Sequence, residues 1–379
     1  MIDTTPAAPP PISEAPAHTS DAPAHTSEAF VQRLLDAVLG TLDVQAAYLG
    51  DRLGYYRLLA EHDEGLNSTE LATGSCTAER YAREWLEQQA VTGFLVASRD
   101  GDALTRRYFL PSGHRAPLTD ELSLHHVLPL ARLVAGLGKQ ADALLQAYRT
   151  GDGVSWAQHG EDARQAQAAA NRPMFLHRLG PTYLASVPDL DATLRAGGRV
   201  ADIGCGLGWS SIGIALSYPE ATVDGYDVDA PSVEAARRNA HEAGLSDRVR
   251  FHVADAAVPP EGGPYDVVTA FECIHDLSDP VGVLSTMHRL AGADGIVLVM
   301  DERVAEVFTA PGDDIERLMY GYSLLCCLPD GMSHQPSAAT GTVMRPETLR
   351  RYAADAGFTQ TEILDIHDDF FRFYRLRQP

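Results

Sequence analysis

The residue types and spacings that could carry out chemistry start with a glycine loop. Gly204, Gly206 and Gly208 alternate with Cys205 and Leu207, directly after Asp202-Ile203. Alternating glycines let the backbone turn sharply and leave no Cβ between the chain and a ligand. A dinucleotide loop would place its third glycine at position 209, where this chain has Trp209. The Gly-Lys-Ser/Thr ending of a phosphate-binding loop is also absent. The loop therefore favours a nucleoside ligand.

Acidic residues follow the next apolar segments. Asp227 stands nineteen residues after Gly208 and begins the sequence Asp227-Val228-Asp229. An acid there can accept both ribose hydroxyls, and Val228 can lie against a purine. Asp255-Ala256 follows the third segment, where a carboxylate can accept a hydrogen bond from an adenine amino group.

His275 and Asp276 follow the fourth apolar segment and are the candidate catalytic pair. With an unperturbed pKa of about 6.5, His275 can take a proton from a hydroxyl or from a carbon beside a carbonyl. Asp276 can orient the histidine or bind a substrate amine. In the alternative interpretation, Asp276 caps the following helix and His275 only packs. Glu302, after the fifth segment, is a second candidate base.

Strands and helices that alternate along the C-terminal half must position these residues. Carboxyl ends of parallel strands meet at one edge of a sheet, where α/β proteins bind ligands. Two final strands complete a predicted sheet of seven. The predicted strands are 199–203, 221–226, 249–253, 265–271, 295–300, 359–366 and 370–376.

The N-terminal half has a different organisation. Residues 1–27 are rich in Pro, Ala, Ser and Thr and predict a disordered tail. Residues 28–117 predict helices at 30–39, 46–59 and 79–89 followed by a hairpin, which is a winged helix. Residues 118–190 are a helical connector with one long helix over 122–148, and 191–379 form the ligand-binding domain.

A winged helix usually binds DNA, but its charge here argues otherwise. The helix that would enter the major groove carries Arg80 and Arg83 against Glu79, Glu84 and Glu87. DNA-reading surfaces are basic. We therefore expect no nucleic-acid partner and a homodimer through this domain.

The composition also argues against nucleic-acid and membrane partners. A chain of 379 residues is long enough for two domains, and its net charge of −22 repels nucleic acids and anionic membrane surfaces. Five cysteines without a Cys-x-x-Cys spacing indicate reduced thiols and a cytoplasmic protein, with neither disulfides nor structural zinc. No apolar run reaches the ~18 residues of a membrane span.

The stretch from Gly198 to Asp301 resembles the core of class I S-adenosylmethionine-dependent methyltransferases. This resemblance implies an α/β fold with a Rossmann-like seven-stranded methyltransferase sheet, joined here to an N-terminal, mostly helical winged-helix domain. It implies S-adenosylmethionine as the cofactor, with Asp202, Gly204 and Gly206 around its methionine part. The other implied contacts are Asp227 with the ribose, Asp255 and Ala256 with the adenine, and Phe271 and Glu272 beside the sulfonium.

The connector resembles the segment that covers the substrate cavity in related methyltransferases. Trp156 and Phe175 are thus candidate pocket walls, together with Tyr322 from the long segment 303–344. Relatives that methylate a carbon beside a keto group bind a metal through a His-Asp pair and a later histidine. Here the later position is Cys326 or Cys327, and although a cysteine would favour a softer metal such as zinc, no metal is predicted.

The predicted function is methyl transfer to an oxygen, nitrogen or activated carbon of a small specialised metabolite. Two alternatives stay open: a transcriptional regulator that senses S-adenosylmethionine through its winged helix, and an oxidoreductase that binds a nicotinamide cofactor on the same sheet. The sequence does not identify the methyl acceptor.

Overall fold

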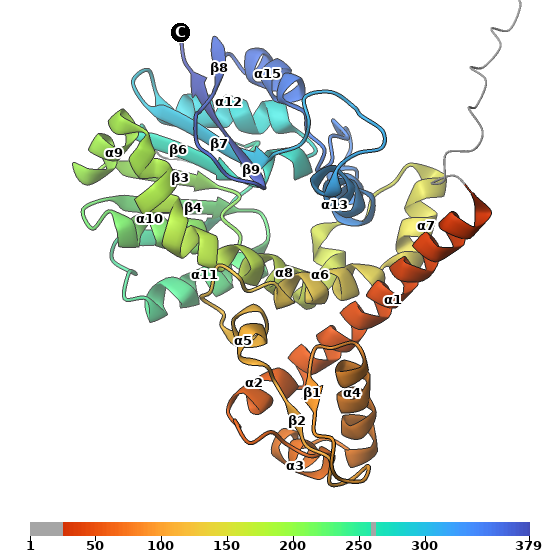
Figure 1. Ribbon diagram of the computed structural model, residues 1–379. Coiled ribbons are helices and arrows are strands. Elements are labelled where there is room, and N and C mark those ends of the chain that lie inside the picture. The colour runs from red at the N-terminus through yellow and green to blue at the C-terminus, as the bar shows by residue number, and fades with distance from the viewer. Residues whose placement is uncertain (1–25, 259–262) are drawn as a thin grey trace, which may run out of the picture.

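The computed structural model describes residues 26–258 and 263–379. Figure 1 shows a sheet domain and a smaller helical domain, with α6 and α8 between them. The predicted disordered tail lies outside the described residues, except for its last two positions. None of the helices in the described part combines the length and apolarity needed to cross a bilayer.

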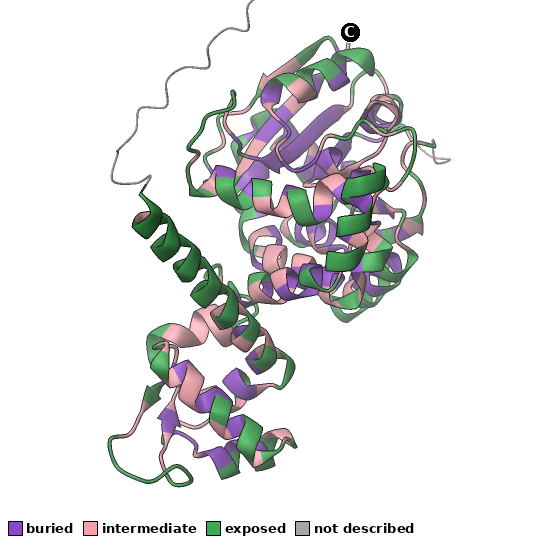
Figure 2. Cartoon of the chain, turned by 90° about the vertical axis from the view of Figure 1, so that its right-hand side faces the viewer, coloured by how far each residue is buried: buried purple, intermediate pink, exposed green. Residues whose placement is uncertain are grey.

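A single helix, α1 (Ser27–Arg52), begins the described chain. The prediction of two separate helices, at 30–39 and 46–59, was wrong because no cap or proline interrupts this stretch. The break comes later, at Gly54, whose left-handed backbone (φ 71°) separates α1 from α2 (Tyr55–Ala60). Large apolar residues on the first half of α1 are exposed, and Figure 2 draws this half of the helix in the green of exposed residues.

The winged helix forms much as predicted. A capping box between Asn67 and Glu70 starts α3 (Ser68–Ser75), and α4 (Glu79–Val91) follows. The strands β1 (Val96–Ala97) and β2 (Tyr108–Phe109) pair antiparallel, but they are shorter than expected, and α5 (Ser112–Thr119) comes next. The core of this domain holds Trp85 between the rings of Tyr55 and Tyr56.

The connector contains more separate helical segments than predicted. The single helix expected over 122–148 was wrong, because α6 (Leu128–Gly138) ends after a glycine pair and α7 (Ala141–Thr150) starts anew. Then come α8 (Trp156–Met174), a π-helical segment (Phe175–Tyr183), a short 3-10 turn (Leu184–Ser186) and α9 (Pro188–Arg195). The α8 helix is kinked at Gly160, which has a φ of 76°.

The seven-stranded sheet is confirmed. Its order is β5-β4-β3-β6-β7-β9-β8, in which β3 to β7 pair parallel to one another and β9 is antiparallel to both of its neighbours, β7 and β8. The strands are β3 (Arg199–Ile203), β4 (Thr222–Asp227), β5 (Val249–Val253), β6 (Val267–Phe271), β7 (Ile296–Glu302), β8 (Gln360–Ile363) and β9 (Phe371–Arg377). Ile203 pairs with both Tyr226 and Ala270, so the carboxyl ends of β3, β4 and β6 lie level.

Apolar clusters bury both faces of this sheet. The helices that follow its strands are α10 (Trp209–Ser217), α11 (Ala230–Glu242), α12 (Pro280–Ala291) and α15 (Pro346–Asp355). The segment 303–344, which was expected to be the least regular, contains α13 (Asp314–Tyr322), a π-helical segment (Ser323–Cys327) and α14 (Leu328–Gly331). Its α14 packs against the short 3-10 turn Ile274–Asp276 that follows β6.

Candidate active site

The glycine turn after β3 keeps open the space in front of it. Gly204 has a φ of 69°, and a Cβ there would lie 2.7 Å from the Cys273 sulfur. Gly206 also has a left-handed backbone (φ 51°), but a Cβ there would meet no atom within 4 Å. Gly204 is therefore required by packing, whereas Gly206 faces a space that a ligand can fill.

Asp202 lies beneath this turn. It is buried, and its carboxylate accepts hydrogen bonds from Ser210 (2.6 Å), Ser211 (2.7 Å) and Thr269 (2.8 Å). Burial raises the pKa of Asp202, although the three hydroxyls act in the opposite direction. The residue thus fastens β3 to the start of α10 and to β6. Direct contact with the methionine part of a cofactor stays a prediction, and the three hydroxyl partners were not predicted from the sequence.

Asp227 closes the other side of the turn. Its Oδ2 accepts from the Gly206 backbone N–H at 2.8 Å, and its Oδ1 accepts from the Asp229 N–H at 2.8 Å. These bonds fix the carboxylate at the end of β4, where the ribose was predicted. Val228, beside it, is 72% exposed. Asp255 is exposed at the end of β5 with Ala256 after it, so the predicted adenine contacts lie at the same edge of the sheet.

Helix α8 reaches this edge through polar contacts that the sequence did not reveal. Arg164 forms a buried ion pair with Asp229, 2.7 Å between Nε and Oδ2. Asn171 and Gln167 donate to Glu272 Oε2 at 3.0 and 3.4 Å. The connector is therefore tied to the ends of both β4 and β6.

Glu272 has one unused buried oxygen. Its Oε1 is buried without a hydrogen-bond partner among the described residues, and its backbone is left-handed (φ 55°). Burial raises the pKa of Glu272 to about 8, even though the Asn171 hydrogen bond and the charge of His275 lower it. A buried, unpaired carboxyl is costly unless a cation or a donor binds it. This oxygen therefore suits a site for a positively charged group.

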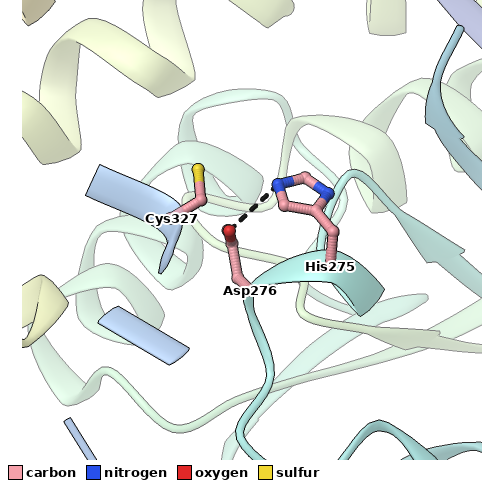
Figure 3. A group of neighbouring side chains, drawn as sticks. All are labelled: His275, Asp276 and Cys327. Atoms are coloured by element: carbon pink, nitrogen blue, oxygen red, sulfur yellow. Dashed lines mark ion pairs between the residues drawn. The ribbon is translucent and has the colours of Figure 1, made fainter. Parts of the chain in front are cut away.

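The two predicted catalytic residues lie together. His275 is 2% exposed, and its Nε2 lies 2.9 Å from Asp276 Oδ1. Its Nδ1 lies 2.8 Å from Asp301 Oδ1 and 2.9 Å from Glu302 Oε2. Figure 3 shows the Asp276 carboxylate directed toward one nitrogen of the His275 ring, with Cys327 nearby. The alternative that Asp276 caps the next helix was wrong, because Asp279 caps α12.

The three carboxylates change the basicity of His275. Burial alone would lower its pKa, but the charges of Asp276, Glu302 and Asp301 outweigh burial and raise it well above 6.5. The expectation of an unperturbed histidine was therefore wrong. The ring is a stronger base than a free imidazole, and a larger share of it is protonated at neutral pH.

Two overlapping groups of donor atoms surround His275. One comprises His275, Asp276 and Cys327, and the other comprises His275, Asp301 and Glu302, with the donor atoms of each group within 4.8 Å of one another. Cys327 is one of the two positions that the resemblance was expected to match with a metal-binding histidine. That this protein works without a metal stays a prediction.

The three residues predicted to line the substrate pocket lie in two different clusters. Trp156 and Tyr322 are half-buried and pack in one cluster with Cys327, next to the His275-Asp276 pair. Phe175 does not join them. It is a core residue of the sheet domain, packed on Phe271 with ring centres 5.9 Å apart, because the π-helical segment turns it toward the sheet. The Phe271 ring is likewise in that core.

The sheet has the fold of class I S-adenosylmethionine-dependent methyltransferases and is preceded by a winged-helix domain. Residues 194–331 match the family described as a methyltransferase domain, and residues 44–120 match the Rv2258c-like winged HTH domain.

The chain is similar to proteins that are named as methyltransferases. It is 27% identical over 174 residues to a ubiquinone biosynthesis O-methyltransferase of Psychrobacter arcticus, covering 45% of this chain and 63% of that one. It is 36% identical over 109 residues to the 27-O-demethylrifamycin SV methyltransferase of Amycolatopsis mediterranei, covering 28% and 40%. The matched region is thus less than two thirds of either relative.

Similarity to solved structures extends over nearly the whole chain. Human N-acetylserotonin methyltransferase in complex with S-adenosylmethionine superimposes with a TM-score of 0.67 at 17% identity, covering 95% of this chain and 99% of that one. At this identity the likeness concerns the fold, including the winged-helix part and the connector.

Proposed function

We propose that this protein transfers a methyl group from S-adenosylmethionine to a hydroxyl oxygen of a small specialised metabolite, with His275 as the general base. The observation that carries the proposal is the buried His275 ring, held on one nitrogen by Asp301 and Glu302 and facing Asp276 with the other. Oxygen is favoured over nitrogen or carbon because the names of both relatives described above specify O-methylation.

The residues present fit the cofactor. Gly206 leaves open space at the turn, Asp227 holds a carboxylate at the end of β4, and Glu272 keeps a buried oxygen unpaired. Asp227 would bind the ribose, and Glu272 would face the positive sulfur. When bound, S-adenosylmethionine supplies a methyl group activated by its sulfonium charge.

The chain's own residues handle the acceptor and its proton. An acceptor O–H would give its proton to His275 Nε2 as its oxygen takes the methyl group that S-adenosylmethionine supplies, with S-adenosylhomocysteine as the second product. Asp301 and Glu302 keep the other nitrogen, Nδ1, protonated and stabilise the imidazolium that results. Since the sulfonium charge disappears during transfer, the site has no new anion to stabilise. Alignment and proton removal are its main contributions.

The charge of the winged helix supports an enzyme over a cofactor-sensing regulator. In α4, Arg80 pairs with Glu84 at 2.5 Å and Arg83 pairs with Glu79 at 3.4 Å. The cations that would contact a DNA backbone are thus engaged with neighbouring carboxylates on the same helix.

Calorimetric titration of the protein with S-adenosylmethionine and, separately, with NAD tests the cofactor assignment. We expect saturable binding of the first and none of the second. Binding of NAD alone would replace the methyltransferase with an oxidoreductase, and specific retention of genomic DNA fragments at physiological salt would favour the regulator.

We further propose that the protein is a homodimer through its N-terminal domain. The first half of α1 exposes a continuous row of large apolar side chains, which a second copy would cover. They are Phe30, Val31, Leu34, Leu35, Val38, Leu39 and Leu42. Light scattering should give twice the chain mass, and Leu35→Glu with Leu39→Glu should give a monomer. A wild-type monomer at micromolar concentration would contradict this.

We also propose that the protein is cytoplasmic. All five cysteines are free, which fits a reducing compartment. Recovery of the protein in the cytoplasmic fraction of its host tests this location, and recovery outside the cell would contradict it.

A further inference from the structure

The helical segment that ends at Gly331 brings a second polar group close to the His275-Asp276 pair. Cys327 and Asp330 are three residues apart, so they lie on the same helical face. The Cys327 sulfur belongs to the close group with His275 and Asp276. Gly331 packs so tightly that a Cβ there would lie 3.0 Å from the Asp276 carbonyl oxygen. Asp330 therefore faces the same space as Cys327.

One oxygen of Asp330 is used by the fold, and the other is free. Oδ1 accepts from the Trp156 backbone N–H at 2.7 Å, at the start of α8. Oδ2 has no hydrogen bond from any described residue. Burial, with the charge of Asp276 as the next cause, raises the pKa of Asp330 to about 7. This carboxyl is thus held in place by α8 and still has an acceptor oxygen available.

His159 adds a buried imidazole that nothing in the described chain satisfies. It is 3% exposed, and neither Nδ1 nor Nε2 has a hydrogen-bond partner among the described residues. Burial lowers its pKa, and the charge that opposes this effect is that of Asp330. Buried polar groups in proteins are nearly always hydrogen-bonded, so an imidazole with two unused nitrogens indicates a missing partner.

An aromatic wall joins these groups to the catalytic pair. Trp156 packs in one cluster with Tyr322 and Cys327, and its ring centre is 6.4 Å from that of His159. His275 and Asp276 thus form one polar region and His159 and Asp330 a second one, and Trp156 lies beside both. We infer that His159 and Asp330 anchor the acceptor by binding a second group on it, a hydroxyl or an amine that donates a hydrogen bond.

The charges near this region disfavour an anion as that second group. Asp276 and Asp301 lie 2.9 and 2.8 Å from the His275 nitrogens, and burial lowers the pKa of His159, so this imidazole offers an anion no positive charge. A carboxylate on the acceptor would be repelled by these two carboxylates, whereas a hydroxyl or an amine would not. The inference rests on the proposed function and narrows it to acceptors with two donor groups on one flat framework.

Ligand-observed NMR on the protein loaded with S-adenosylhomocysteine can test this with simple probes. The probes are phenol, the three benzenediols and the three hydroxybenzoates. We expect at least one benzenediol to bind about tenfold more tightly than phenol, which is the effect of one additional buried hydrogen bond. No hydroxybenzoate should bind more tightly than phenol.

Two variants locate the effect. Asp330→Asn keeps the Oδ1 that accepts from Trp156 and replaces only the free oxygen, so the helix start is preserved. This variant and His159→Ala should each reduce the advantage of the diol to less than about threefold. Asp314→Asn, a change of the same kind at a side chain that is 92% exposed on α13, should leave it intact.

The affinity for S-adenosylhomocysteine, measured for every variant, distinguishes a failure of the proposed anchor from a failure of the proposed methyl transfer. If that ligand binds but diols bind no better than phenol, or keep their advantage in Asp330→Asn, the anchor is overturned and the proposed methyl transfer stands. Absence of S-adenosylhomocysteine binding to the wild type would overturn both.

Discussion

The Nδ1 of His275 lies 2.8 Å from Oδ1 of Asp301, a contact between the loop after β6 and the end of β7 that leaves Nε2 directed toward Asp276. This pairing sets the direction in which the ring can accept a proton. It also raises the basicity of the ring through a buried negative charge. The candidate base follows β6 directly, and its contact with Asp301 at the end of β7 therefore fixes its ring.

His275→Ala should lower turnover by about 10²-fold or more and leave S-adenosylmethionine affinity nearly unchanged, because it removes the proton acceptor without touching the glycine turn. Turnover is measured as S-adenosylhomocysteine release with any accepted substrate. The matched control is His334→Ala, since His334 is an exposed histidine in the loop after α14. Unchanged turnover in the first variant would remove His275 from the mechanism.

Asp227→Ala should weaken S-adenosylmethionine binding at least ~10-fold, because its carboxylate would bind the ribose and also fixes the Gly206 N–H. Titration calorimetry gives the affinity directly. Asp294→Ala, at an exposed acid before β7, serves as the control. Equal affinities in the two variants would count against the cofactor position.

The rate of methyl transfer should rise with pH and level off above the raised pKa of His275. Only the neutral ring can accept the proton, and the surrounding carboxylates hold its pKa well above 6.5. Asp301→Asn removes one of the charges that raise this pKa, so the midpoint of the pH profile should move to lower pH. A midpoint that stays in place in this variant would mean that another group controls the rate.

Asp162 should contribute to the stability of the connector. Its carboxylate accepts from Lys139 at 2.5 Å, Tyr48 at 2.9 Å and Arg132 at 3.0 Å, which ties α1 and α6 to α8. Burial alone would raise the pKa of Asp162, but these partners outweigh it and lower the pKa from 3.8 to about 2. The lowered pKa corresponds to a stabilisation on the order of 2 kcal/mol.

Because the folded-state pKa is the lower one, this stability is present above pH ~4 and is lost as the pH falls toward 2. Urea unfolding of Asp162→Asn at pH 7 should show the loss, and the difference from wild type should shrink at pH 3. Asp152→Asn, at an exposed position before α8, is the control. Equal unfolding midpoints for Asp162→Asn and wild type at pH 7 would contradict this role.

Activity should survive dialysis against a chelator, since the proposed chemistry needs only a base and an aligned donor. Cys327→Ser should likewise retain the cofactor affinity of the wild type. Loss of turnover on chelation, restored by zinc or iron, would show that the His275-Asp276-Cys327 group is a metal site after all.

The sheet could be predicted closely because its signals are local. Apolar runs end in small or acidic residues, and two strands, 199–203 and 249–253, begin and end where expected. The position of Asp227 followed from the strand spacing alone. Helices were harder wherever stopping signals were weak, so α1 was divided in the prediction and the stretch 122–148 was not.

The parts of the site that the sequence did not reveal depend on packing between distant segments. Arg164 and Asn171 meet the ends of β4 and β6 because α8 folds over this edge, and Asp330 of α14 meets the start of α8. No spacing links residue 156 to residue 330, and nothing local distinguishes His159 from a core histidine. Phe175 was predicted to line the substrate site, but the π-helical segment turns its side chain into the core of the sheet domain.

A crystal structure of the protein with bound S-adenosylmethionine would test the central claim most directly. The account predicts the ribose hydroxyls on Asp227, the sulfur beside Glu272 and the methyl group directed toward His275. A donor bound elsewhere, or a methyl group directed away from His275, would contradict it.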